Sequence, residues 1–200
     1  MDLTRQFALP KGISGKLVGR LMAKRHVWQV DAVIADLKPA AGESVLEIGF
    51  GPGTSLVALA RAQSEAQICG IDPSPLMVAE ARRRVRQFGP RVQVLDGTAA
   101  ALPWDEAHFD AVFAINSVQL WQPRVDSLAE VLRVLKPGGR LVLGVVEVAV
   151  LPDLSRVGPE FDQVLVPQLT QAGFADITAE WRPKPGGGQC LFVRATRPVG

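Results

Sequence analysis

The chain has 200 residues, of which 48% are hydrophobic and 21% are charged, and its formal net charge is +2. This composition is typical of a single globular domain with a sizeable core, and it excludes a disordered chain. The small net charge provides no general attraction to nucleic acid. No apolar run is long enough to span a membrane and the first residues do not form a signal-peptide pattern, so we expect a cytoplasmic protein.

The predicted elements begin with a helical segment. Hydrophobic residues between positions 14 and 37 recur at helical spacing, which predicts one or two helices before the first strand. Five short apolar runs then suit buried strands, and amphipathic helical patterns separate most of them. These runs are 45–48, 68–71, 92–95, 111–115 and 141–146. The alternation predicts a parallel sheet with right-handed crossovers.

Local signals predict where two of the helices begin or end. Ser74 followed by Pro75 combines a capping side chain with a first-turn proline, so a helix is expected to start there. Ser127 and Glu130 have the spacing of a capping box. The Lys-Pro-Gly-Gly sequence at 136–139 predicts the end of that second helix before the fifth strand.

The last part of the chain has a different organisation. A helix is predicted near 160–172, followed by strands near 177–181 and 190–195 with three glycines at 186–188 between them. Two strands joined this closely can only form an antiparallel hairpin.

The two cysteines carry no sign of metal or disulfide chemistry. Cys69 and Cys190 lie in apolar, strand-like runs and lack the spacing of metal ligands. We interpret both as small buried hydrophobic residues of a reducing compartment, and the sequence predicts no metal site.

Three alternate glycines follow the first predicted strand: Gly49, Gly51 and Gly53. In a parallel α/β sheet, the loop at this point is where backbone and ligand come closest. Glycine has no Cβ and accepts positive φ, at a cost of roughly 0.5–1 kcal/mol per residue. Three such residues in one loop predict a ligand site.

The spacing of this loop separates possible ligands. A phosphate-binding P-loop requires a lysine, and residues 49–60 contain none. A dinucleotide fingerprint requires a third glycine where Thr54 stands, which weakens that alternative. It is not excluded, because Asp72 lies about 20 residues further on, where a ribose-binding acid belongs.

Acidic residues favour a third ligand, S-adenosylmethionine (SAM). Glu47, Asp72 and Asp96 lie at or beside the carboxyl ends of the first three predicted strands, and no Lys or Arg flanks the loop. SAM carries a sulfonium and an ammonium group with one carboxylate, and a net cation prefers acidic surroundings. The charges therefore favour SAM.

With these motifs, the chain resembles the class I SAM-dependent methyltransferases, and especially those of ubiquinone and menaquinone biosynthesis. The resemblance covers about residues 40–146. It rests on five motifs in order, at 45–53, 70–74, 96–104, 109–112 and 130–139.

The resemblance implies an α/β fold with a Rossmann-like doubly wound sheet, mostly parallel and ending in a C-terminal antiparallel hairpin. A single domain is expected over residues 1–200. Within it we expect an N-terminal helical cap at 1–38, a SAM-binding core at 40–146, and a C-terminal helix and hairpin at 147–200.

The resemblance also implies roles for individual residues. The three glycines would line the methionine part of SAM, with Glu47 near its amino group, and Phe50 departs from the small or polar residue common in the family. Asp72 would accept hydrogen bonds from both ribose hydroxyls. The residues expected around the adenine are Pro73, Met77, Asp96, Gly97 and Thr98.

Candidates for the acceptor side lie outside these motifs. The resemblance implies that Asn116, just past the fourth predicted strand, would face the methyl-transfer centre through its backbone. His26 and Glu147 are the candidate general bases, needed only if the acceptor must lose a proton. Since few residues remain outside the core, we expect a small-molecule or lipid-like acceptor. The sequence Asn-Ser-Val-Gln at 116–119 lacks the motif of nucleic-acid base methylases, which argues against that partner.

Two alternative functions remain at this point. One is a nucleotide-cofactor oxidoreductase that uses NAD(P). The other is a non-catalytic protein of the same fold that acts as a scaffold.

Overall fold

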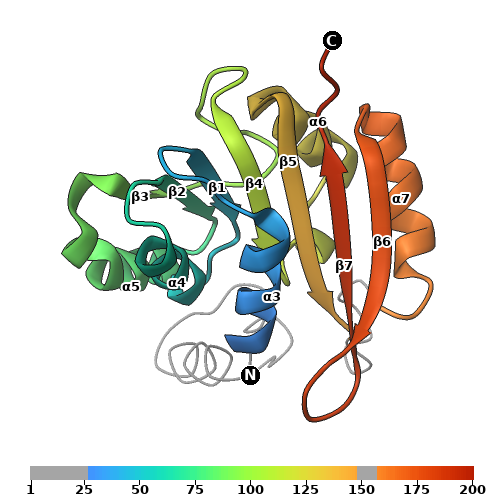
Figure 1. Cartoon of the computed structure of the whole chain (residues 1–200), viewed down its shortest axis with the longest axis horizontal. Coiled ribbons are helices and arrows are strands. Elements are labelled where there is room, and N and C mark those ends of the chain that lie inside the picture. Colours follow the sequence, from blue (N-terminus) through green and yellow to red (C-terminus); the bar gives the residue numbers. More distant parts are fainter. Residues whose placement is uncertain (1–26, 148–156) are drawn as a thin grey trace.

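The computed structural model describes residues 27–147 and 157–200. This part of the chain forms a seven-stranded sheet with helices on both faces (Figure 1). The strands are β1 (Ser44–Ile48), β2 (Gln67–Asp72), β3 (Val92–Asp96), β4 (Phe109–Ile115), β5 (Leu135–Val146), β6 (Ala175–Pro183) and β7 (Gln189–Thr196). The helices are α3 (Val27–Leu37), α4 (Thr54–Ala62), α5 (Pro75–Val85), α6 (Arg124–Val134) and α7 (Phe161–Ala172).

The strand order is β3-β2-β1-β4-β5-β7-β6. Strands β1 to β5 are parallel, whereas β7 is antiparallel to both β5 and β6. The chain order reverses between β1 and β4, which is where ligands bind in open α/β sheets. The predicted fold class, a mostly parallel doubly wound sheet with a C-terminal hairpin, is confirmed.

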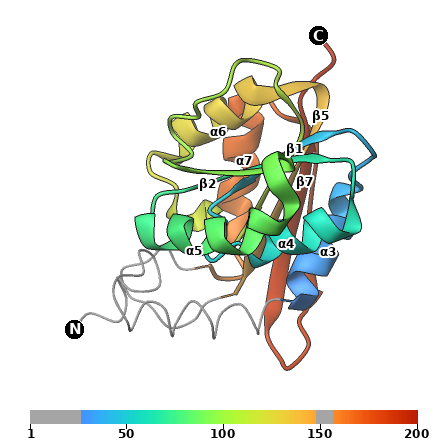
Figure 2. The ribbon, with the colours of Figure 1, turned by 90° about the vertical axis from the view of Figure 1, so that its left-hand side faces the viewer.

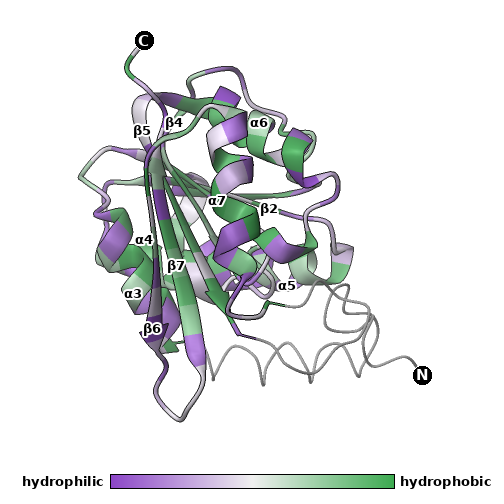
Figure 3. Ribbon diagram, turned by 90° about the vertical axis from the view of Figure 1, so that its right-hand side faces the viewer, coloured by the Kyte–Doolittle hydropathy of each residue, from purple (hydrophilic) through white to green (hydrophobic). Residues whose placement is uncertain are grey.

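Alternating side chains divide the core between the two faces of the sheet. On one face, strand residues such as Val45 and Phe113 pack with α3, α4 and α5. On the other face, residues such as Leu46 and Val112 pack with α6 and α7. Figure 2 shows α3 and α4 on the opposite side of the sheet from α7. Figure 3 shows mainly apolar residues along β7 and alternating polar and apolar residues along helices such as α7.

The boundary between α6 and β5 differs from the sequence prediction. Helix α6 starts at Arg124, so Ser127 lies within the helix. The Ser127 hydroxyl donates a hydrogen bond to the Pro123 carbonyl at 2.8 Å, and the predicted capping box is therefore wrong. The helix ends at Val134, and residues 136–139 already belong to β5. Here the pairing of β5 with β4 shifts register. Sheet pairing thus extends over a segment whose proline and two glycines predict a turn.

Both cysteines are free thiols in or near the core. Cys190 is fully buried on β7 and Cys69 is partly buried on β2. Burial raises the pKa of Cys190 to about 12 and that of Cys69 to about 11. Both are therefore protonated at neutral pH and act as small packing residues.

Candidate functional site

Three carboxyl groups lie along one edge of the sheet. Glu47 is the fourth residue of β1, and Asp72 and Asp96 end the neighbouring strands β2 and β3, where they are paired in register. Each acid lies two or four positions from an apolar residue of its own strand, so the two side chains are on the same face. These apolar residues, Val45, Ile68 and Val94, pack on the face covered by α3, α4 and α5, and the three acids therefore point to that face. The sequence prediction that these acids lie together is consistent with this placement.

Asp72 joins the loop after β1 to the loop after β2. Its Oδ2 accepts a hydrogen bond from the Gly51 amide at 2.8 Å, and its Oδ1 accepts one from the Ser74 amide at 2.9 Å. The side chain is buried, and burial raises its pKa to about 6 although both hydrogen bonds lower it. The nearby Asp96 carboxyl, which is exposed, raises the pKa further. Each Asp72 oxygen keeps a second lone pair for a ligand.

Glu47 is the most deeply buried of the three acids. Its Oε1 accepts a hydrogen bond from the Ser55 hydroxyl at 2.5 Å, and among the described residues its buried Oε2 has no hydrogen-bond partner. Burial raises the pKa of Glu47 to about 8, the Ser55 hydroxyl opposes this rise, and the charge of Asp72 adds to it. A cation placed beside Glu47 would stabilise its ionised form.

Glycine is required at the three loop positions for different steric reasons. All have positive φ, between 54° and 79°. A Cβ on Gly49 would lie 2.7 Å from the Ser117 hydroxyl, and a Cβ on Gly53 would lie 2.8 Å from the Ala81 side chain. A Cβ on Gly51 would meet no atom of the described residues within 4 Å. Packing within the protein therefore accounts for two of the glycines, and of the three only Gly51 has no described neighbour at its Cβ position.

The Phe50 side chain points into the core. Phe50 is buried, and a Cβ on Gly70 would lie 2.7 Å from its ring. The unusual residue of the loop thus covers the glycine of β2. Its side chain is a packing element, and any contact of Phe50 with a ligand would come from its backbone.

The residues expected around an adenine surround the ends of β2 and β3. Pro73 and Thr98 are exposed, Gly97 is half-buried, and Met77 lies 2% exposed on α5. The Gly97 amide donates to the Asp72 carbonyl at 3.3 Å, which ties the two strand ends together. Pro75 is the first residue of α5 and Ser74 occupies its N-cap position, as predicted, but the Ser74 side chain makes no capping hydrogen bond to the helix.

Asn116 follows β4 directly and has a left-handed backbone with φ 54°. Its side chain is held by Gln29 of α3 and by the Val146 amide of β5. The next residue, Ser117, donates to the Ile48 carbonyl at 2.6 Å. Ser117, Ser55 and Gln29 were missed by the sequence analysis, because nothing in the pattern around each residue indicates its distant partner.

The structure describes one of the two candidate bases. Glu147 follows β5 at the same edge of the sheet and is half-buried, and its amide donates to the Gln189 carbonyl at 2.9 Å. His26 lies outside the described residues.

No helix within the described ranges is both long and apolar enough to cross a membrane.

These features fit a ligand that carries positive charge. Within the two described ranges, Glu47, Asp72 and Asp96 form no ion pair, and one oxygen of Glu47 is buried without a hydrogen bond. Gly51 lies beside one of these acids, because its amide donates to Asp72, and no described residue lies within 4 Å of its Cβ position. The acidic edge is therefore suited to the cationic groups of SAM.

Comparisons with known proteins agree with this arrangement. A family model described as a methyltransferase domain matches residues 45–139. The chain is 27% identical over 183 residues to the uncharacterized methyltransferase YdaC of Bacillus subtilis strain 168, covering 89% of this chain and 97% of that protein. It is 36% identical over 157 residues to the demethylmenaquinone methyltransferase of Clavibacter sepedonicus, covering 77% of this chain and 61% of that enzyme.

The fold is also similar to a solved structure that contains the methyl donor. This is a phosphoethanolamine N-methyltransferase from Haemonchus contortus in complex with SAM, with a TM-score of 0.73 and 19% identity. The match covers 86% of this chain and 53% of that one. The matched family model and the sequence relatives show that the chain carries a methyltransferase domain of the SAM-dependent type, and the solved structure shares its fold.

Proposed function

We propose that this protein transfers a methyl group from SAM to a small-molecule or lipid-like acceptor. The observation that carries the proposal is the acidic edge itself. Three carboxyl groups on one face of β1, β2 and β3 adjoin a glycine loop in which no described residue lies within 4 Å of the Gly51 Cβ position, and they have no cationic partner among the described residues. Membership of the methyltransferase family disfavours the oxidoreductase alternative, and retention of all three acids disfavours a scaffold.

In this proposal, each acid recognises a different part of SAM. Asp72 accepts hydrogen bonds from the ribose hydroxyls through its remaining lone pairs, and Asp96 accepts a hydrogen bond from the adenine amino group. Glu47 attracts the amino group of the methionine part, and Gly51 allows the backbone to approach it closely. The bound cofactor supplies an activated methyl group on a sulfonium. The protein then contributes by holding donor and acceptor in line and by excluding water.

The nature of the acceptor is supported by the relatives. The enzyme of Clavibacter sepedonicus is a demethylmenaquinone methyltransferase, and a relative from Nitrobacter hamburgensis is a ubiquinone/menaquinone biosynthesis C-methyltransferase. Almost all described elements of this chain belong to the sheet and its covering helices. We therefore assign the acceptor side to the loops after β4 and β5, with residues 1–38 as a cap. Glu147 is the described candidate for proton removal.

Calorimetric titration with SAM tests the proposed cofactor site. The wild-type protein is expected to bind SAM, and Asp72→Ala is expected to weaken binding at least about tenfold, because it removes charge-assisted hydrogen bonds. Asp110→Ala is the matched control. Asp110 lies at the opposite end of the sheet, where it pairs with Lys136, so its loss should leave SAM affinity unchanged. Absence of SAM binding by the folded wild-type protein would refute the proposal.

The acceptor class can be tested with methyl-labelled SAM. The protein is incubated with a cell metabolite extract that is afterwards separated into lipid and aqueous phases. Label in the lipid phase supports a quinone-like acceptor, and label on a small molecule in the aqueous phase supports a polar one. Label found only on nucleic acid or protein would contradict the proposed acceptor class.

A further inference from the structure

Two side-chain amides, 87 residues apart in the chain, form a reciprocal pair near the candidate site. The Asn116 Nδ2 donates to the Gln29 Oε1 at 2.8 Å, and the Gln29 Nε2 donates back to the Asn116 Oδ1 at 3.2 Å. Gln29 also donates to the Cys190 sulfur at 3.2 Å, and only 2% of its surface is exposed. A buried amide in the first turn of an otherwise apolar helix face requires such partners, because burying it unpaired is costly.

A glycine of the sheet leaves room for the Gln29 amide. A Cβ on Gly144 of β5 would lie 2.7 Å from Val33 and 3.2 Å from the Gln29 Nε2. The absence of a side chain at Gly144 thus lets α3 approach the ends of β4 and β5. The Gly144 carbonyl also accepts a hydrogen bond from the Asn116 amide at 2.8 Å. Helix α3 and the turn after β4 are therefore fixed against the same residue.

The turn held by this pair lies directly against the glycine loop. Ser117 donates to the Ile48 carbonyl, and its side chain fills the space beside Gly49. In the strand order, the acids of β2 and β3 lie on one side of β1, and the turn after β4 lies on the other. A SAM molecule whose adenosine part contacts Asp72 and Asp96 would therefore direct its methionine end toward Asn116 and Ser117.

We propose that Gln29 is a positioning residue for methyl transfer. Through its amide pair with Asn116, it fixes the turn after β4 and so sets the surroundings of the methyl-bearing end of SAM. Gln29 does not contact the reacting atoms in this proposal, and it acts through Asn116. The inference rests on the proposed SAM site and adds a role for α3, which none of the five sequence motifs includes.

The test compares SAM with S-adenosylhomocysteine, which lacks the transferred methyl group. Calorimetry is used to measure both affinities for the wild-type protein and for Gln29→Leu, which removes the hydrogen bonds to Asn116 and to the Cys190 sulfur while keeping a similar volume. A displaced turn should weaken SAM about fivefold more than S-adenosylhomocysteine. A merely structural role for Gln29 would weaken the two ligands equally or lower only the melting temperature.

Asn116→Gly provides a second route to the same result. Glycine accepts the left-handed backbone without strain, so this variant keeps the turn accessible and removes the side chain with its hydrogen bonds to Gln29 and to the Val146 amide. It should change the ratio of the two affinities as Gln29→Leu does, and the double variant should add little, because both changes break one pair. The Asn116→Gly result decides the matter if Gln29→Leu does not fold.

Asp36→Asn is the control on the same helix. Asp36 ties α3 to the C-terminal hairpin and does not contact Asn116, so this variant should leave the affinity ratio unchanged. Equal loss of both affinities in Asn116→Gly, or additive effects in the double variant, would overturn the inference. A folded wild-type protein that binds neither ligand would instead refute the proposed function.

Discussion

The glycine loop shows how one residue type can serve different purposes within five positions. Gly49 has a φ of 77° and lies against Ser117, whereas Gly51 has no described residue at its Cβ position. Gly42 has the same φ of 77°, and a Cβ there would meet no atom of the described part of the chain within 4 Å. Gly42 and Gly49 therefore differ in steric surroundings but not in the φ they require.

We expect Gly42→Ala to lower the free energy of unfolding by about 1 kcal/mol, which is the cost of a left-handed alanine. Gly49→Ala should lower it by about 1–3 kcal/mol more, because the new methyl group displaces Ser117 and weakens its bond to Ile48. Chemical denaturation measures both values. Equal destabilisation by the two substitutions would show that Ser117 moves away without cost.

Residue-scale prediction succeeded where the signal is local. Glu47, Asp72 and Asp96 could be placed together from sequence, because each follows or ends an apolar run and parallel strands bring those ends to one edge. Ser55, Ser117 and Gln29 could not be identified in this way. Their partners are 8, 69 and 87 residues away, and no periodic pattern records such a pairing.

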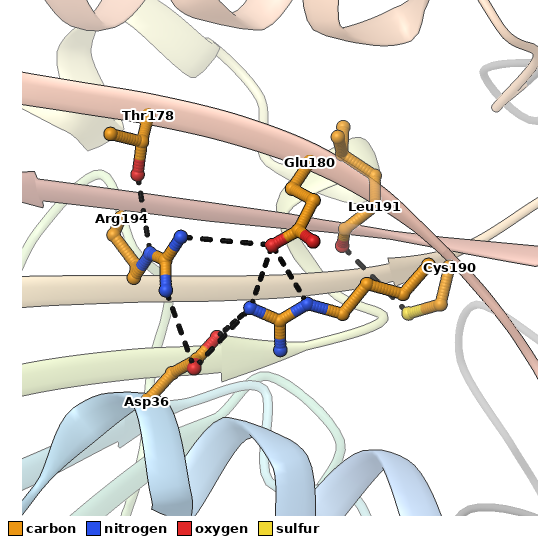
Figure 4. Close-up of polar contacts among 7 residues, drawn as sticks. Asp36, Thr178, Glu180, Cys190, Leu191 and Arg194 are labelled. Atoms are coloured by element: carbon orange, nitrogen blue, oxygen red, sulfur yellow. Dashed lines mark hydrogen bonds and ion pairs between the residues drawn. The ribbon is translucent and has the colours of Figure 1, made fainter.

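At the scale of elements, an ionic cluster connects α3 to the hairpin of β6 and β7. Asp36 of α3 lies 3.0 Å from Arg182 and 3.5 Å from Arg194, and both arginines also approach Glu180 (Figure 4). The Arg194 Nε donates to the Thr178 hydroxyl at 3.2 Å. The cluster thus fastens the first described helix to the last two strands of the chain.

Asp36→Asn should lower the free energy of unfolding by about 1 kcal/mol, because the Asp36 carboxylate forms ion pairs with two arginines and is only 14% exposed. The matched variant Glu180→Gln removes a carboxylate that is 52% exposed and should cost less than about 0.5 kcal/mol. The difference should shrink in 1 M salt, where charges are strongly screened. A larger effect at Glu180 than at Asp36 would contradict this account.

Element prediction was accurate for buried strands and weaker at boundaries. The run at 68–71 lies within β2 and the run at 111–115 lies within β4, because an apolar stretch between turn signals suits a buried strand. The start of β5 at Leu135 could not be predicted. Its pairing with β4 recruits a Pro-Gly-Gly segment, and only the neighbouring strand determines that pairing.

At the scale of the whole molecule, the acidic edge makes stability depend on pH. Burial raises the pKa of Glu47 from 4.5 to about 8 and that of Asp72 from 3.8 to about 6. Between the ordinary and the raised values, the folded protein holds a proton that the unfolded chain has released. The free energy of unfolding of the ligand-free protein should therefore fall as pH rises through this window.

Glu47→Gln should flatten this dependence between pH 6 and pH 8, since glutamine keeps a similar shape and does not titrate. Denaturation at pH 6, 7 and 8 measures the slope for the variant and for the wild-type protein. Comparison of the two slopes removes the contribution of groups that titrate in both proteins. Parallel curves would show that Glu47 is ionised throughout this range in the folded state.

Helix α3 also constrains the order in which a newly made chain can assemble. The acidic edge is built from β1, β2 and β3, which lie close together in sequence and pair with one another. The surface that receives α3 includes β7, and the contact between Gln29 and Cys190 joins residues 161 positions apart. Contacts of such long range slow folding, and β7 is the last of the described strands to be synthesised. Among the described elements, α3 is thus synthesised first, and its contacts are complete only once β7 has been made.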